Sequence, residues 1–109
     1  LAQATVDAHP GSTFESEHKV QYRNMSSVLD QYPDVTANAM KAIEESGLEV
    51  RQMAVRGGTD GSPLSLNGLP TPNIFAGEQN YHSRYEWVSV QDMLKSAEVI
   101  VRLAQIWAN

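Results

Sequence analysis

Residues 13–22 alternate between less polar side chains on one side and mostly charged or polar side chains on the other. A period of two with one charged face is typical of a β-strand whose sheet has one side in water. His18 lies on the less polar side, where we expect a packed and hydrogen-bonded imidazole. The residues before this strand, 1–8, have weak helical character and look like the end of a helix, which Pro10 and Gly11 terminate.

Two longer segments have the apolar spacing of a helix. Residues 34–46 follow a proline, have an acid near the positive end of the helix dipole, and stop at Gly47. Residues 90–108 follow Ser89, and Asp92 three positions later gives this helix a start like a capping box. The predicted apolar faces are Val35, Ala39, Met40, Ala42 and Ile43 in the first helix, and Met93, Leu94, Ala97, Ile100, Val101, Ala104 and Trp107 in the last.

Three shorter elements are predicted between these helices: a half-exposed strand at 48–55, a short helix at 62–68 that Ser62 caps, and a buried strand at 71–76. The order of helix, strand, helix, strand, helix is typical of a layered α/β domain. The strand at 13–22 looks like part of a different sheet. We therefore expect a domain boundary within residues 23–29, where Ser26 or Ser27 could cap a short turn.

Composition and charge exclude some classes of partner but do not identify the function. The chain has 109 residues, 41% of them hydrophobic, and a net charge of −5 with no basic cluster, so nucleic acid and anionic membrane surfaces are not expected as partners. Its apolar runs are too short to span a bilayer. The absence of cysteine fits a reducing compartment, and we expect a cytoplasmic protein. The chain begins with Leu1 and not with Met, which suggests a piece of a longer protein.

A glycine-rich loop, Arg56-Gly57-Gly58-Thr59-Asp60, is the first candidate site. Its glycines let the backbone approach a ligand, the following helix start presents free N–H groups, and the Arg56 guanidinium matches a carboxylate. This pattern predicts a pocket for a carboxylate or phosphate. The same residues fit a plain tight turn equally well, with Arg56 in solvent and Asp60 as a helix cap. The spacing is not that of a Walker or Rossmann motif.

His82, in the loop after the predicted buried strand, is the second candidate. Imidazole is a common zinc ligand, but a zinc ion needs at least three protein ligands. His9 and His18 lie in what looks like another part of the fold, whereas Glu78 and Glu86 are close enough in sequence to be ligands or to orient the imidazole. Taken alone, a single loop histidine is more often polar surface.

Three stretches together carry a resemblance to a known family: Arg-Gly-Gly-Thr-Asp-Gly at 56–61, Leu-Ser-x-x-Gly-Leu-Pro-x-Pro-Asn-Ile-Phe-x-Gly at 64–77, and Asn-Tyr-His at 80–82. They resemble the peptidase T family of tripeptide aminopeptidases, within the di-zinc metallopeptidase clan. The match is dense over 56–88 and looser in the last helix. Tyr22-x-Asn24-Met25 is also similar to the family's exit from its lid domain.

The resemblance implies a two-domain enzyme with an α/β catalytic domain that carries two zinc ions, and a smaller α+β lid domain. Residues 1–24 would then be the last helix and strand of the lid, and residues 25–109 the C-terminal part of the catalytic domain. His82 would be a zinc ligand and Arg56 would bind the substrate carboxylate. The site-lining residues would be Gly57, Gly58, Thr59 and Asp60.

The remaining zinc ligands and the glutamate base of that family would lie before Leu1, so no catalytic residue is expected in this chain and the isolated chain should be inactive. The chain departs from the family at Glu78, where a second glycine is common, and at Ser83, where glycine is common. The expected function is hydrolysis of short peptides, with release of the N-terminal residue of tripeptides. The expected partners are a short peptide and the rest of the same polypeptide.

Two alternatives remain open at this point. The chain could be a self-standing α/β module that binds a small carboxylate without catalysis, because most metal ligands are missing. It could also form a homo-oligomer through exposed strand edges.

Overall fold

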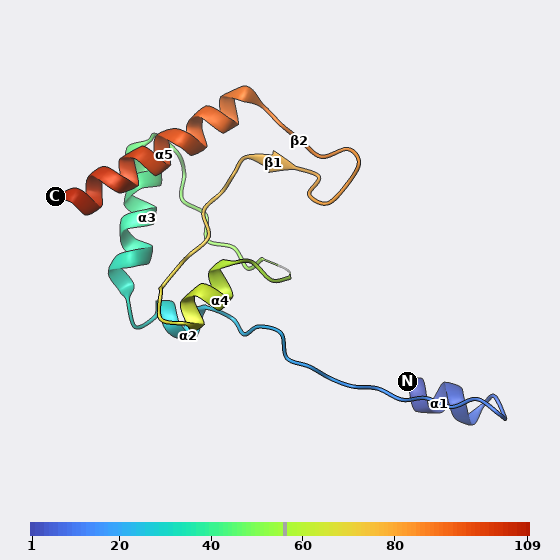
Figure 1. The fold of residues 1–109 in the computed structure, drawn as a ribbon. Helices are drawn as coiled ribbons and strands as arrows, with labels where there is room; N and C mark the ends of the chain where they lie inside the picture. Colours follow the sequence, from blue (N-terminus) through green and yellow to red (C-terminus); the bar gives the residue numbers. More distant parts are fainter. Residues whose placement is uncertain (56) are drawn as a thin grey trace.

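The computed structural model describes residues 1–55 and 57–109. Its helices and strands are α1 (Ala2–Asp7), α2 (Ser26–Leu29), α3 (Pro33–Glu45), α4 (Gly61–Leu66), β1 (Glu78–Gln79), β2 (Trp87–Val88) and α5 (Val90–Ala108). Figure 1 shows α2 to α5 and the two strands gathered together, with α1 at the far end of an extended segment. The fold is thus a mixture of helices and one small sheet. No helix among the described residues is both long and apolar enough to cross a membrane.

The two long helices agree with the sequence to within a residue at each end, because their ends are set locally. α3 begins with Pro33 and ends at Glu45, two residues before Gly47, whose φ is +77°. At the start of α5, Ser89 Oγ accepts a hydrogen bond from the Asp92 N–H at 3.0 Å and donates one to Asp92 Oδ2 at 2.7 Å. The predicted cap of α5 is therefore confirmed.

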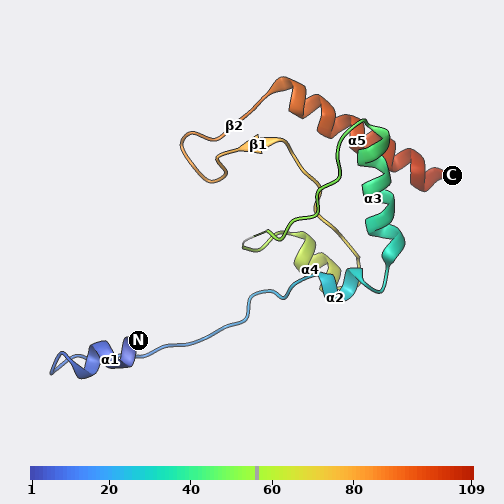
Figure 2. The same ribbon diagram turned by 180° about the vertical axis from the view of Figure 1, so that it is seen from behind.

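The core lies where α5 crosses the C-terminal half of α3, which Figures 1 and 2 show from opposite sides. The fully or almost fully buried apolar residues among those described are Ala39, Ala42 and Val99. Polar contacts flank this seam, because Lys95 Nζ donates to the Ser46 carbonyl at 2.9 Å and Arg102 Nε lies 3.7 Å from Glu45 Oε2. Lys95 therefore ties α5 to a carbonyl at the C-terminus of α3, an end that attracts cations.

The apolar face predicted for α5 is not the face that packs. Val99 lies about one turn from both Lys95 and Arg102, so this side of the helix meets α3. Met93, Leu94, Ile100, Val101 and Trp107, from the predicted face, are each more than half exposed. The prediction was wrong because α5 is apolar on more than one side, and α3 covers only one of them.

None of the three predicted strands forms among the described residues. Segment 13–22 is extended and exposed, with no neighbouring strand, and His18 is exposed as well, so its predicted packing is wrong. Segment 48–55 is also extended without strand pairing. A strand needs a second backbone for its hydrogen bonds. An alternating pattern predicts an extended conformation, but it does not show which segment would pair with it.

The predicted strand at 71–76 is extended but is held by helix side chains. The Thr71 N–H donates to Ser65 Oγ at 2.9 Å, and Ser96 Oγ donates to the Phe75 carbonyl at 3.2 Å. The segment thus runs from α4 to α5 and is mostly half-buried. It carries the backbone to the only described strand pair, the two-residue ladder of β1 and β2.

Two predicted helix starts differ in detail. At the start of α2, Asn24 Oδ1 accepts from the Ser26 N–H at 2.9 Å, so neither Ser26 nor Ser27 is the cap. α4 begins at Gly61, and Ser62 Oγ donates to the Arg23 carbonyl at 2.9 Å rather than capping the helix.

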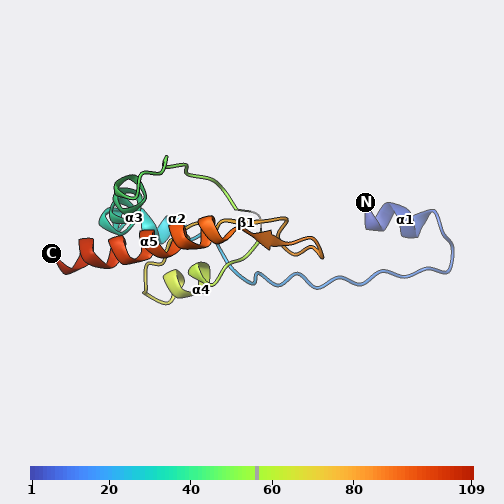
Figure 3. The same ribbon diagram turned by 90° about the horizontal axis from the view of Figure 1, so that it is seen from above.

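The structure is elongated. Its Cα radius of gyration is 19.9 Å, whereas a compact chain of this length has about 13 Å. Its accessible surface is 8973 Å², against about 6,000 Å² for a compact protein of this mass. Figure 3 shows one cause, the segment between α1 and α2 that runs away from the helices. The exposed apolar residues of α5 add further to the accessible surface.

Gly77 allows β1 to start against the first turn of α5. Its φ is +85°, a conformation that costs a residue with a side chain about 1–2 kcal/mol. A Cβ built on Gly77 would also lie 2.5 Å from the Asp92 Cβ. Gly77 is therefore needed both for its backbone angle and for the close approach.

Replacing Gly77 by alanine is expected to lower the free energy of unfolding by about 2–4 kcal/mol, from backbone strain together with steric overlap. The matched control is Gly68→Ala, because Gly68 has a φ of +96° but open space at its Cβ position. The control should lose only about 1–2 kcal/mol. Urea unfolding of both variants measures the difference, and equal losses would contradict the close approach.

Candidate functional site

A β-hairpin presents His82. β1 and β2 pair antiparallel, with Glu78 opposite Val88 and Gln79 opposite Trp87, and residues 80–86 form the loop between them. The sequence did not predict this hairpin, since strands of two residues are too short to show a period. The available sequence signals of a turn were Gly77 and Asn80, because glycine and asparagine favour turns.

The hairpin loop holds His82 in an unusual backbone conformation. The φ of His82 is +61° and that of Asn80 is +56°, both in the left-handed region that residues with side chains seldom adopt. The His82 N–H donates to Glu86 Oε2 at 2.7 Å, and the Glu86 N–H donates to the Ser83 carbonyl at 3.0 Å. These bonds across the loop hold the turn, while His82 itself is exposed.

Glu86 makes a contact that the sequence did not predict. Its carboxylate accepts from the His82 backbone N–H, so it fixes the main chain at His82. Arg84 lies over the Tyr85 ring, 4.8 Å from the centroid, and its Nη2 donates to the Tyr85 hydroxyl at 2.6 Å. Both contacts link neighbouring loop residues, and the ring stays mostly exposed.

The glycine-rich loop is described from Gly57 onward, and Arg56 lies outside the described residues. Gly57 is exposed with a φ of +86°. Thr59 Oγ1 accepts from Asn73 Nδ2 at 2.9 Å, which ties the loop to segment 71–76. Asp60 occupies the position before α4 but makes no capping hydrogen bond with its side chain.

This geometry changes the predicted anion pocket. α4 has only six residues, and the exposed Asp60 carboxylate stands at its start. A negative charge at the helix start does not favour a second anion there. A carboxylate ligand is therefore still predicted to pair with Arg56, and not with the first N–H groups of α4.

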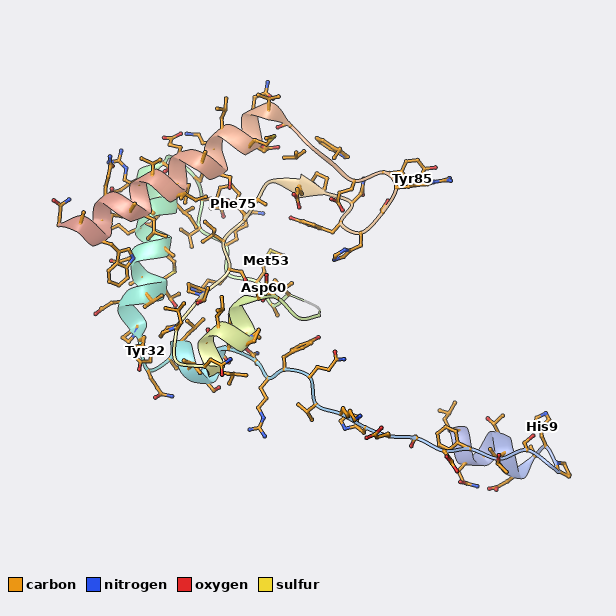
Figure 4. The ribbon with its side chains drawn as sticks, viewed as in Figure 1. His9, Tyr32, Met53, Asp60, Phe75 and Tyr85 are labelled. Atoms are coloured by element: carbon orange, nitrogen blue, oxygen red, sulfur yellow. The ribbon has the colours of Figure 1, made fainter. Side chains whose placement is uncertain are left out.

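The two candidate loops lie on the same side of the molecule. Figure 4 shows Asp60 and Tyr85, which mark the two loops, both on the side away from α3 and Tyr32. There are also two shallow surface hollows, one lined by His18, Lys19, Val20, Gln21 and Tyr22, and the other by Val20, Gln21, Tyr22, Arg23 and Leu66. Both follow the extended segment and include no predicted site residue.

Over residues 1–55 and 57–109, no three His, Cys, Asp or Glu side chains gather closely enough to hold a metal ion. Zinc sites use at least three protein ligands. These residues therefore do not make a metal site by themselves. A metal at His82 would need ligands from outside them.

The chain belongs to the peptidase family M20/M25/M40, whose family model matches residues 3–106. Among its relatives is a peptidase T of Caldanaerobacter subterraneus subsp. tengcongensis, 42% identical over 109 residues, which are 100% of this chain and 27% of the relative. A peptidase T of Shouchella clausii is 43% identical over the same length and the same shares. A peptidase T of Clostridium botulinum is 48% identical over 92 residues, 82% of this chain and 22% of the relative.

These matches confirm the resemblance to peptidase T over the whole chain. The chain spans 27% of the length of the first two relatives, so it corresponds to about a quarter of such a protein.

Glu86→Ala is expected to speed hydrogen exchange at the His82 amide about fivefold, because a net hydrogen bond of about 1 kcal/mol is lost. Glu86→Gln keeps an acceptor oxygen and should stay closer to the wild type. Exchange followed by NMR at that amide measures both. Unchanged exchange in the alanine variant would show that the Glu86 carboxylate does not hold the loop.

Proposed function

We propose that this chain is the C-terminal part of a metal-dependent peptidase that hydrolyses short peptides and releases the N-terminal residue of tripeptides. Two kinds of observation support the proposal. The family match covers residues 3–106, and relatives named peptidase T match the chain from end to end. The single structural observation that carries it is the backbone of His82, left-handed and bonded to Glu86.

Backbone strain of this kind is informative. A non-glycine residue in the left-handed region costs about 1–3 kcal/mol, and such residues cluster at functional sites. His82 keeps that conformation although its side chain is exposed and packs into no core. In this proposal the strain serves to aim the imidazole away from the hairpin, toward ligands that other parts of the protein contribute.

His82 would supply one ligand to zinc, out of two zinc ions in the whole enzyme. When bound, zinc acts as a Lewis acid and lowers the pKa of a bound water. The task of this chain is to hold the imidazole in place through the hairpin loop. The general base and the other ligands are assigned to the rest of the polypeptide, so the 109 residues alone should be inactive.

The glycine-rich loop would be the substrate side of the site. Arg56 is assigned to the substrate carboxylate, and Gly57, Gly58, Thr59 and Asp60 to the lining beside it. Support comes from the placement of this loop on the same side as the His82 hairpin. The exposed and half-exposed state of residues 57–60 leaves part of their surface open to a peptide.

The rest of the same polypeptide is the natural cover for the open face of α5. We assign residues 25–109 to the catalytic domain and residues 1–24 to the lid, which agrees with the extended chain between α1 and α2. Met93, Leu94 and Trp107 would then be buried in the whole enzyme. The cytoplasmic location and a homo-oligomer stay predictions.

The alternative, a self-standing module that binds a carboxylate, has no support in the fold. The described residues bury little apolar surface, and the radius of gyration of 19.9 Å is that of an elongated chain. Calorimetry of the isolated chain with a small dicarboxylate separates the two. Heat of binding at micromolar concentration, without metal, would favour the module over the peptidase.

In the whole protein, His82→Ala should remove one of the two bound zinc ions and reduce tripeptide hydrolysis by at least about a thousandfold, since a metal ligand is lost. Metal analysis and a tripeptide hydrolysis assay measure the two effects. His18→Ala is the control, because His18 is an exposed histidine on the extended segment. Wild-type zinc content and activity in His82→Ala would refute the assignment.

A further inference from the structure

The ring of Tyr22 lies directly on the backbone of Gly58. A Cβ built on Gly58 would be 2.5 Å from Tyr22 Cε1 and 2.9 Å from both Cδ1 and Cζ. No side chain fits in that space while the ring stays where it is. The φ of Gly58 lies outside the left-handed region, in contrast to the φ of +86° at Gly57, whose Cβ position is open. Gly58 is thus needed for the contact with Tyr22, whereas Gly57 is needed for the turn.

The neighbours of Tyr22 contact the start of α4, the helix that directly follows the loop. The Arg23 carbonyl accepts a hydrogen bond from Ser62 Oγ at 2.9 Å, a contact between residues far apart in the sequence. The Met25 Cε lies 3.1 Å from the Cβ position of Gly61, which is buried. Residues 22–25 therefore contact the glycine-rich loop at Gly58 and the start of α4 at Gly61 and Ser62.

Asn73, in segment 71–76, also contacts the glycine-rich loop. Its Nδ2 donates to Thr59 Oγ1 at 2.9 Å and lies 4.0 Å from Met25 Sδ. The glycine-rich loop is consequently placed by side chains from two other segments rather than by a sheet. Of these contacts, only the Tyr22 ring touches the exposed part of the loop beside Gly57.

We propose that Tyr22 is a positioning residue for the glycine-rich loop, and that it sets where Gly58 and its neighbours meet a peptide substrate. The proposal rests on the proposed function, in which this loop lines the substrate site. Tyr22 lies near the end of the extended segment between α1 and α2. Because its ring contacts Gly58, a shift of this segment would also shift the loop. Tyr22 acts on substrate binding and not on the reacting groups.

A double-mutant cycle in the whole protein tests this role, with tri-alanine as the substrate. Tyr22 is 43% exposed and its ring can swing aside, so Gly58→Ala should leave the unfolding midpoint nearly unchanged while it displaces the ring. Gly58→Ala and Tyr22→Ala should each raise KM about fivefold, with kcat changed less than about twofold. The double variant should be no worse than either single variant, because both remove the same contact.

Two further variants serve as controls. Tyr22→Phe keeps the ring and should retain the wild-type KM. Tyr32→Ala removes a tyrosine of similar exposure, 50%, on the other side of the molecule, and should leave KM unchanged. Additive effects of Gly58→Ala and Tyr22→Ala, or a wild-type KM in Tyr22→Ala, would overturn the proposal.

Hydrogen exchange separates failure of this inference from failure of the proposed function. Amides of residues 57–60 should exchange faster in Tyr22→Ala than in Tyr22→Phe, whether or not the protein hydrolyses tri-alanine. If His82→Ala is inactive but the loop exchanges equally in both variants, the positioning role is wrong and the peptidase assignment stands. If the wild-type protein hydrolyses no tripeptide, the proposed function fails. The comparison of hydrogen exchange in Tyr22→Ala and Tyr22→Phe still shows whether Tyr22 holds the loop.

Discussion

The packing of α5 against α3 is the contact on which the other elements depend. Small side chains at Ala39 and Ala42 allow α5 to approach, and Val99 fills the seam. Lys95 then closes the C-terminus of α3. No other place among the described residues buries apolar side chains so completely. We therefore describe α5 as the frame, meaning the helix to which the other segments attach.

Both candidate loops are attached to that frame through side-chain contacts. Segment 71–76 is bound to α5 by Ser96 and to α4 by Ser65, and Gly77 brings its end against Asp92. The hairpin that presents His82 starts at that point. The glycine-rich loop is held by residues from segments 22–25 and 71–76. A loop held in this way can be shifted by its neighbours.

The sequence predicted α3, α4 and α5 because a helix makes its hydrogen bonds internally and its ends depend on nearby residues such as Ser89 and Gly47. It predicted no correct strand, because the partners of segments 13–22 and 48–55 are not encoded in those segments. His82 could be singled out from the Asn-Tyr-His motif, but its left-handed backbone and its bond to Glu86 could not. The contact between Tyr22 and Gly58 joins distant parts of the chain, so local patterns do not show it.

In the function proposed here, the hairpin aims His82 at a metal ion in the whole enzyme. The most direct measurement is a crystal structure of the zinc-loaded whole protein, with zinc located by anomalous scattering. The account predicts a zinc peak about 2.0–2.1 Å from one imidazole nitrogen of His82, with the residue still in its left-handed conformation. Zinc bound elsewhere, with the His82 imidazole in solvent, would contradict it.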